Sequence, residues 1–424
     1  MSIPSETDYT LSEVKGIQQK SYVSRATNGS VFGDNQQIQF NLINNKATYI
    51  VPESLYLSAK IKISSATSNL NTIMGLPGVS VVQRSDLFCN STNIETVNNY
   101  NAVVNALIAS KTDVAQRNGM SKCFGNDPSA TLYFDVDGSA PNATGAGNVL
   151  ELNVSVPLCN ALANAAKYIP LDSGMFILYL TLSSAGEFCI QTDGSAPDAD
   201  IVFQLSEAEL HYKCLTFGMG MDQLIKSAVN PDGNILFKSE SYASSVANLP
   251  TGSSGSQAFS YASSYSSIKS LFTLFTSGLT KNMASYNPNF QNIYWQIAAE
   301  NYPQTAITKD SDAVIEYLEA VHGINSNPTA FSTCISNRNW RSINSPEITA
   351  AGYKNLSKAF FGVNCESMSG KDRYYSGVPS QNSNVVLRLD INPAITDSST
   401  IIQVFHYDLV MVYNPALGQM TVMK

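Results

Sequence analysis

Alternation of apolar and polar residues dominates the chain. Residues 38–42 place Ile38, Phe40 and Leu42 on one face, and residues 55–63 alternate in the same way. A period of two is typical of a half-buried β-strand. Similar stretches cover 150–156, 176–182 and 386–391, and longer strands are predicted at 201–217 and 400–414. The pattern therefore predicts an all-β protein.

Three stretches have helical spacing instead. Residues 97–113 carry an apolar stripe at intervals of three and four, and residues 157–169 form a shorter candidate with Pro157 near its start. The best helix is predicted at 309–324, where Asp310 or Ser311 would cap the start and Gly323 would end it. These helices are expected in loops between strands.

The two halves of the chain resemble one another. Each ends in a long apolar strand with a His-Tyr pair, His211-Tyr212 and His406-Tyr407, preceded by a regular alternating strand and a mid-way helix. We therefore expect two tandem eight-stranded jelly-roll β-sandwiches, residues 34–225 and 226–424, with the link near 218–233. Residues 1–33 show no comparable alternation, so we expect an N-terminal arm that serves assembly and lies outside a core.

Composition narrows the function. Charged residues make up 14% of the 424-residue chain, and the net charge is −8. The acidic balance disfavours nucleic-acid binding, which requires a cationic surface. Low charge with 21 Tyr and 18 Phe is typical of surfaces that become buried between proteins, although a large β-protein with polar loops would look the same.

The sequence offers little catalytic material. Of the three histidines, His211 and His406 lie within apolar strands and are expected to be hydrogen-bonded packing residues, while His322 lies at a helix C-terminus, where the dipole favours it. No nucleophile elbow, phosphate-binding loop or zinc-protease motif is present. We expect no catalytic residue, no cofactor and no metal.

Two residue groups leave alternatives open. The first is acidic and could suggest calcium, but it lacks the spacing of an EF-hand loop and reads as surface turns: Asp135, Asp137, Asp193, Asp198 and Asp200. The second is aromatic and could form a sugar-binding shelf or pack loops onto the sandwich: Tyr294, Trp295, Tyr302, Trp340, Tyr374 and Tyr375. A glycosidase carboxylate pair could come from distant strands, and Glu151, the one strand glutamate of note, faces away from the apolar set.

Cysteine usage suggests a reducing compartment. The seven cysteines are odd in number, scattered, and partly within apolar runs. The first residues carry Glu6, Asp8 and Glu13 and lack the apolar core of a secretory signal, and the longest apolar run is too short to span a bilayer. We expect a chain made in the cytosol and an oligomer that does not depend on disulfides.

Five segments, in this order, are similar to those of the double jelly-roll major capsid proteins of the adenovirus-like and PRD1-like viruses, including virophages and polinton-like viruses. Residues 38–63 resemble the first strand pair, 156–183 the strand, "lPl" and long-strand segment, and 203–217 the strand that closes the first jelly roll. Residues 266–275 and 404–422 resemble parts of the second. The resemblance covers most of the chain, and it lies in the order of the segments more than in single motifs.

The resemblance implies a homotrimer with a pseudo-hexagonal outline, six jelly rolls per capsomer, tiling an icosahedral shell. Its partners would be neighbouring capsomers, minor or penton proteins, and an inner membrane. It would lie in the virion capsid after assembly inside the host cell, without sequence-specific nucleic-acid contacts. Two rival functions remain: a tandem β-sandwich carbohydrate-binding or spike protein, and a β-sandwich glycosidase with two close carboxylates.

Overall fold

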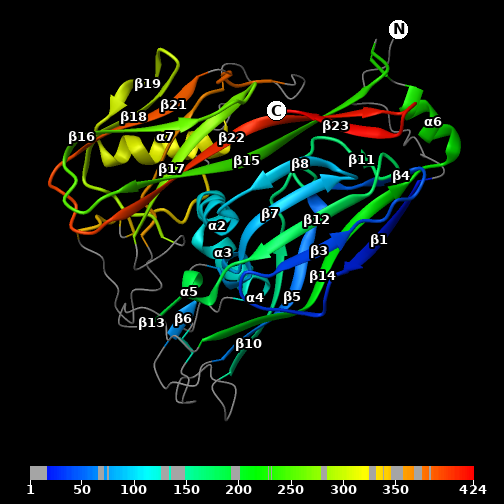
Figure 1. Cartoon of the computed structure of the whole chain (residues 1–424), viewed down its shortest axis with the longest axis horizontal. Helices are drawn as coiled ribbons and strands as arrows, with labels where there is room; N and C mark the ends of the chain where they lie inside the picture. Colours follow the sequence, from blue (N-terminus) through cyan, green and yellow to red (C-terminus); the bar gives the residue numbers. More distant parts are fainter. Residues whose placement is uncertain are drawn as a thin grey trace, which may run out of the picture.

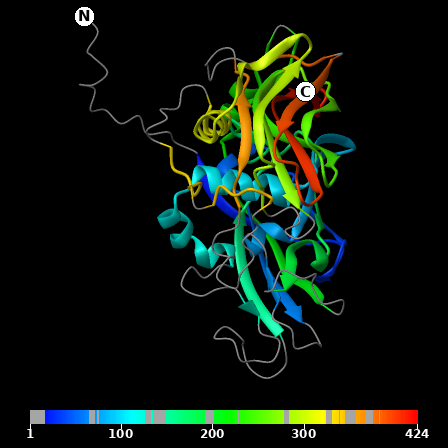
Figure 2. The same cartoon turned by 90° about the vertical axis from the view of Figure 1, so that its left-hand side faces the viewer.

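Two β-sandwiches in tandem make up the computed structural model of the chain (Figures 1 and 2). Each sandwich is one half of the sequence, and the ladders of the two halves do not mix among the described strands. The structure describes residues 17–64, 71–73, 76–125, 133–134, 149–191, 201–227, 229–230, 232–277, 284–323, 331–337, 339–344, 357–366, 375–381 and 383–424.

The first sandwich pairs a seven-stranded sheet with a four-stranded one. The larger sheet contains β1 (Gln18–Arg25), β2 (Val31–Phe32), β4 (Thr48–Ile50), β5 (Tyr56–Ser64), β10 (Val149–Pro157), β11 (Ile169–Pro170) and β14 (Val202–Thr216). The smaller contains β3 (Gln37–Asn41), β7 (Val82–Cys89), β8 (Thr92–Val97) and β12 (Phe176–Leu182). A minor sheet is formed by β6 (Asn71–Ile73), β9 (Tyr133–Phe134) and β13 (Cys189–Gln191).

The second sandwich has a five-stranded and a four-stranded sheet. The first of these contains β15 (Ile235–Leu249), β17 (Ile268–Ser277), β20 (Phe360–Asn364), β22 (Ser399–Asn414) and β23 (Gln419–Met423). The other contains β16 (Gly255–Ala262), β18 (Phe290–Ile297), β19 (Glu300–Ile307) and β21 (Asn384–Ile391).

The same eight-stranded plan occurs twice. In the first half the strands pair in the orders β1-β14-β5-β10 and β3-β12-β7-β8, and in the second half in the orders β15-β22-β17-β20 and β16-β21-β18-β19. Each strand of one half thus has a counterpart at the same place in the chain order of the other. The expected pair of eight-stranded jelly rolls is confirmed, and the described strands outside this plan are β2, β4, β6, β9, β11, β13 and β23.

Helices occupy the connections between strands. They are α1 (Pro77–Ser80), α2 (Tyr100–Lys111), α3 (Val114–Gly119), α4 (Ser121–Phe124), α5 (Ala185–Phe188), α6 (Met219–Ser227) and α7 (Asp310–His322), with the 3₁₀ turn Pro52–Ser54. The predicted helices at 97–113 and 309–324 are confirmed as α2 and α7. Both follow the fifth core strand of their half, and they pack against each other. The Tyr317 hydroxyl of α7 lies 2.7 Å from the Ser110 hydroxyl of α2.

The expected arm at 1–33 is wrong for its second part. Strand β1 pairs with β14 along its whole length, from Gln18 opposite Thr216 to Arg25 opposite Glu209, and Phe32 of β2 lies in the core. β1 is the first core strand of the first jelly roll, so that unit begins before residue 34. The sequence hid this because β1 is an edge strand with mostly exposed, polar side chains. Residues 1–16 lie outside the described part of the chain.

Two smaller predictions are also wrong. The predicted helix at 157–169 is absent: residues 158–168 form turns between β10 and β11, because their amides bond to partners such as Glu95 and Asn160. Helix α7 begins after Lys309 without a side-chain cap, although Gly323 does end it with φ of 86°. Helix α6, which no pattern predicted, spans the expected link, and the described strands before it pair only with one another, as do those after it.

Candidate functional site: the seam between the sandwiches and a buried charged cluster

The two sandwiches meet along β8 of the first and β15 of the second. Glu95 on β8 is fully buried, and its carboxylate accepts a hydrogen bond of 2.6 Å from the Ser241 hydroxyl of β15 and one of 2.7 Å from the Ala161 amide. The Ser239 hydroxyl of β15 donates to the Ala161 carbonyl at 2.6 Å. One carboxylate therefore links a strand and a loop of the first sandwich to the second.

The free edge of β15 is covered by the first sandwich. β15 pairs with β22 along one edge, so the backbone carbonyls along its other edge have no partner among the described strands. The side-chain amide of Asn164 donates to the Glu240 carbonyl at 3.2 Å, and the backbone amide of Ala166 donates to the Lys238 carbonyl at 3.0 Å. An open strand edge is a template for unwanted pairing. The loop around Asn164 removes that edge within the chain.

Apolar packing continues across this seam. The larger of the two hydrophobic core clusters contains most of the first sandwich together with residues of the second, among them Tyr242, Phe272, Tyr317, Tyr407 and Met411. The other cluster lies between the two sheets of the second sandwich. The seam is therefore an extension of a core.

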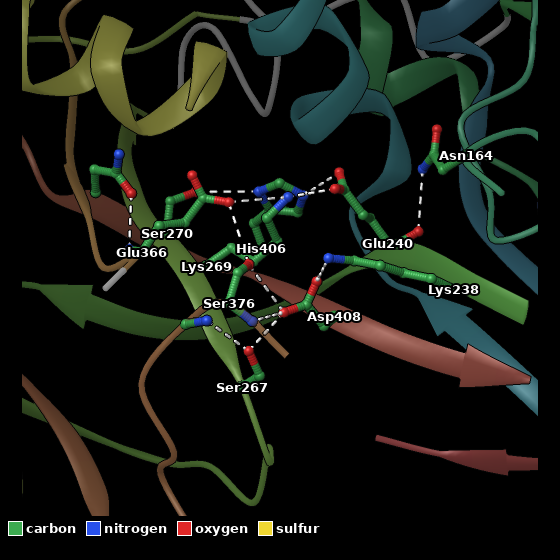
Figure 3. Close-up of polar contacts among 12 residues, drawn as sticks. Asn164, Lys238, Glu240, Ser267, Lys269, Ser270, Glu366, Ser376, His406 and Asp408 are labelled. Carbon is green, nitrogen blue, oxygen red and sulfur yellow. Dashed lines mark hydrogen bonds and ion pairs between the residues drawn. The ribbon is translucent and has the colours of Figure 1, made fainter. Parts of the chain in front are cut away.

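A cluster of charged side chains lies on β15, β17 and β22 of the second sandwich and on the segment that follows β20 (Figure 3). The Lys269 ammonium contacts the carboxylates of Glu240 and Glu366, the latter at 3.2 Å. The Lys238 ammonium lies 3.4 Å from the Asp408 carboxylate, which is fully buried. Three carboxylates thus face two ammonium groups and His406.

His406 joins the strands through both ring nitrogens. Nε2 lies 3.1 Å from the Glu240 carboxylate and Nδ1 lies 3.2 Å from the Ser270 hydroxyl. Because a carboxylate only accepts, Nε2 carries the proton, and Nδ1 of the neutral ring accepts a hydrogen bond from the Ser270 hydroxyl. The ring also stacks on Tyr242 with centroids 4.6 Å apart.

Burial and charge set the protonation states of these groups. Burial works to raise the pKa of Glu240, but the His406 hydrogen bond and the Lys269 charge outweigh it and hold that pKa well below its usual range. Burial lowers the pKa of His406, against the opposing effect of Glu240. For Lys269, the carboxylates of Glu240 and Glu366 outweigh burial and raise its pKa. At neutral pH the Glu240 carboxylate is therefore ionised and the Lys269 ammonium is charged, beside a neutral His406 imidazole.

Many hydrolases also contain a hydrogen-bonded chain of serine, histidine and carboxylate, in which the serine is the nucleophile. Here Ser270 is 1% exposed and His406 is 7% exposed, so a substrate would not reach the hydroxyl in this arrangement. The contacts instead tie β17 and β22 to β15. This is the packing role predicted for His406.

The other two histidines also have partners. His211 stacks on Tyr56 with centroids 4.7 Å apart and lies 3.4 Å from the Glu209 carboxylate. His322 donates from Nε2 to the Ser110 carbonyl of α2 at 3.1 Å, so it joins the two loop helices. Burial lowers its pKa.

The aromatic residues singled out in the sequence do not form one surface. Trp295 is fully buried and its indole N–H donates to Gln403 at 2.9 Å, and Trp340 packs against Phe361 in the second core. Tyr302 is half-buried, and Tyr375 is 38% exposed. Tyr374 lies outside the described residues. The two tryptophans thus follow the packing alternative.

The acidic residues considered for calcium, Asp135, Asp137, Asp193, Asp198 and Asp200, lie outside the described residues. Within the part that is described, no three His, Cys, Asp or Glu side chains gather as metal ligands do. Glu151 is exposed and pairs with Lys60 at 2.7 Å. All seven cysteines are unpaired, and burial raises the pKa of thiols such as Cys214 and Cys365 to about 12. Among the described helices, none has the length and apolar character needed to cross a bilayer.

Two hollows are found away from the charged cluster. One of about 770 Å³ lies where the sandwiches join, with Tyr49, Phe217, Ile225 and Phe237 in its lining. Another of about 880 Å³ lies along β1, β5, β10 and β14 and includes Arg25, Glu207 and Glu209. Neither hollow is lined by Ser270 or His406.

Sequence reasoning missed Glu95, Glu240 and Lys269. Charged residues within strands are ordinarily expected to face solvent, and the partners of Glu95 and Glu240 include residues more than a hundred positions away. A charged residue inside a strand that is otherwise buried, such as Asp408 in β22, is the one signal that a polar cluster existed.

Similarity in sequence gives no assignment. No protein-family model matches the chain, and no curated protein matches it significantly.

Similarity in structure is extensive. The Faustovirus major capsid protein matches with a TM-score of 0.63 at 8% identity, over 94% of this chain and 90% of that one. The PBCV-1 protein VP54, fitted into a reconstruction of the Sputnik virophage, matches with a TM-score of 0.62 at 11% identity, over 99% of both chains. A chain of the Sputnik virophage structure matches with a TM-score of 0.57 at 12% identity, over all of this chain and 92% of that one. The chain therefore has the double jelly-roll fold.

Proposed function

We propose that the chain is the major structural subunit of an icosahedral virus capsid and has no catalytic role. One observation carries the proposal: both jelly rolls match, in order and over nearly the whole length of both chains, proteins described as major capsid proteins or as virus capsid. A single sandwich is a common architecture with many functions. Two sandwiches fused at a buried seam are a far more specific arrangement.

The unit we propose is a homotrimer in which six jelly rolls form a pseudo-hexagonal outline, with each chain divided near residues 225/226. Neighbouring capsomers, minor or penton proteins and an inner membrane would complete the shell, assembled inside the host cell. The low content of charged residues supports extensive lateral contacts. The net charge of −8 argues against direct packaging of nucleic acid.

The test is the mass and shape of the purified protein. We expect a native mass of three times 45.8 kDa and particles with a hexagonal outline in negative stain. A stable monomer across the micromolar range, with no assembly on crowding, would count against a capsid subunit.

The assembly arm that we expected at the N-terminus is proposed only for residues 1–16, since β1 belongs to the sandwich. Deleting residues 1–16 should leave the trimer intact and reduce the yield of closed shells. Deleting residues 1–30 should prevent folding, because it removes β1 from β14. Normal shells from the shorter deletion would exclude the arm role.

A further inference from the structure

Two copies of one plan within a chain allow each strand to be compared with its counterpart. At the seam, the first sandwich contributes β8 and the second contributes β15, and these two strands contact each other. Their counterparts are β19 in the second sandwich and β1 in the first. Within one chain, β19 and β1 belong to opposite sandwiches and are not joined by any described ladder.

Burial differs between counterparts in one direction. On β15, Ser239, Ser241 and Tyr242 are at most 5% exposed, whereas on β1 Lys20 is exposed, Tyr22 is half-buried and Val23 is 50% exposed. β8 and its counterpart β19 differ in burial in the same way. Ile94, Glu95 and Val97 of β8 are buried, while seven of the eight residues of β19 are exposed or half-buried.

The ladders give the residue correspondence. Val23 lies opposite His211 and Tyr242 lies opposite His406, so Tyr22 corresponds to Ser241. Glu95 lies opposite Leu87 and Tyr302 lies opposite Trp295, and both of those residues come two positions before the end of their strand. Tyr302 therefore corresponds to Glu95.

We propose that β1 of one copy docks against β19 of a second copy of this chain, in the place that β15 takes against β8 within the chain. Tyr22 would then meet Tyr302, and Val23 would become buried as Tyr242 is. This inference rests on the proposed trimer and names the strands that hold it together. Because the two surfaces differ, the contact is head-to-tail, and such contacts close into rings when the rotation permits.

Charge and strand chemistry support this partner. β1 carries Lys20 and Arg25, the latter paired with Glu209 of β14, whereas β19 carries Glu300 and is followed by Asp310 and Asp312 in the first turn of α7. Pro303 in β19 lacks an amide hydrogen, so that strand resists indiscriminate ladder pairing. The seam within the chain is likewise held through side chains such as Glu95 and Ser241.

A matched pair of substitutions tests the surface. Val23→Asp puts a charge at the centre of the proposed contact, and Val202→Asp puts the same charge on an equally exposed valine at the far end of β14, opposite Ser64. We expect Val23→Asp to raise the concentration for half-assembly at least tenfold, while Val202→Asp stays a trimer. Equal assembly by the two folded variants would overturn the inference.

Cross-linking gives a second readout that does not depend on weakening the contact. In a background with Cys123→Ser, which removes the exposed thiol, Tyr22→Cys and Tyr302→Cys are combined and treated with a short bis-maleimide. We expect covalent dimers and trimers from the double variant and neither from the single variants. A trimeric double variant that does not cross-link overturns the strand assignment and leaves the proposed function standing. A wild-type protein that is monomeric overturns both.

Discussion

The strands that close the two jelly rolls, β14 and β22, have the same place in the fold and different surroundings. Along β14 buried residues alternate with exposed ones, such as Gln204, Glu207 and Lys213. Along β22 all residues from 401 to 411 are buried. The larger sheet of the first sandwich has an open outer face, whereas β22 is covered on both faces within the chain. The same strand arrangement therefore forms a partly exposed sheet around β14 and a buried sheet around β22.

The His-Tyr pairs follow this difference. Each histidine stacks on a tyrosine of a neighbouring strand, His211 on Tyr56 and His406 on Tyr242. His211 remains partly exposed beside Glu209, while His406 is buried with Glu240 and Ser270. Burying a polar ring requires that its hydrogen bonds be satisfied, and the charged cluster supplies them. Because β22 is buried, the His406 ring needs hydrogen-bond partners inside the protein, and the charged cluster provides them.

The largest expected effect comes from removing the cation at the centre of that cluster. Lys269→Ala leaves the carboxylates of Glu240 and Glu366 without their ammonium partner, and we expect a loss of about 3–5 kcal/mol of unfolding free energy. The control in the first sandwich is Lys60→Ala, whose solvent-exposed pair with Glu151 is screened by water, so the loss of unfolding free energy should be far smaller. Urea denaturation measures both, and similar losses would contradict the distinction between a buried and a surface sheet.

We expect the buried carboxyl group of Glu95 at the seam to make the free energy of unfolding depend on pH. Burial raises the pKa of Glu95 to about 7, above the ordinary 4.5 of the unfolded chain. The contribution of the buried carboxyl is therefore fully present below about pH 4.5 and is lost as the pH rises through 7. Between pH 5 and 8 we expect the wild type to lose on the order of 2 kcal/mol relative to Glu95→Gln, which keeps both hydrogen-bonding positions.

Parallel stability curves for the wild type and Glu95→Gln over that range would show that Glu95 does not titrate at the seam. The comparison of the two proteins isolates this carboxyl from Lys424 and Asp86, whose charges also act on it.

The smallest expected effect separates the two histidines. His406→Ala removes a buried ring and leaves Glu240 and Ser270 without it, at a cost of about 2 kcal/mol, whereas His211→Ala should cost less than about 1 kcal/mol. Thermal unfolding of both variants beside the wild type measures the two losses of stability. If His211→Ala were the more damaging change, the proposed difference in surroundings would be reversed.

The strand pattern could be predicted from the sequence because alternation reports one covered face, as in β5 and β12. The continuous apolar run of β22 is typical of a strand covered on both faces. β1 was not predicted as a strand because its side chains are exposed within one chain. The partners of Glu95 were also not predicted, since Ser241 lies in the other sandwich. The local sequence pattern predicts which face of a strand is buried, but it does not predict which distant segment covers that face.

The most direct test of the account is a cryo-EM reconstruction of the purified oligomer at side-chain resolution. The account predicts a ring of six jelly rolls, two from each of three chains, in which β1 of every chain is covered by β19 of the next. A ring in which β1 faces solvent, or a particle that contains a single chain, would contradict it.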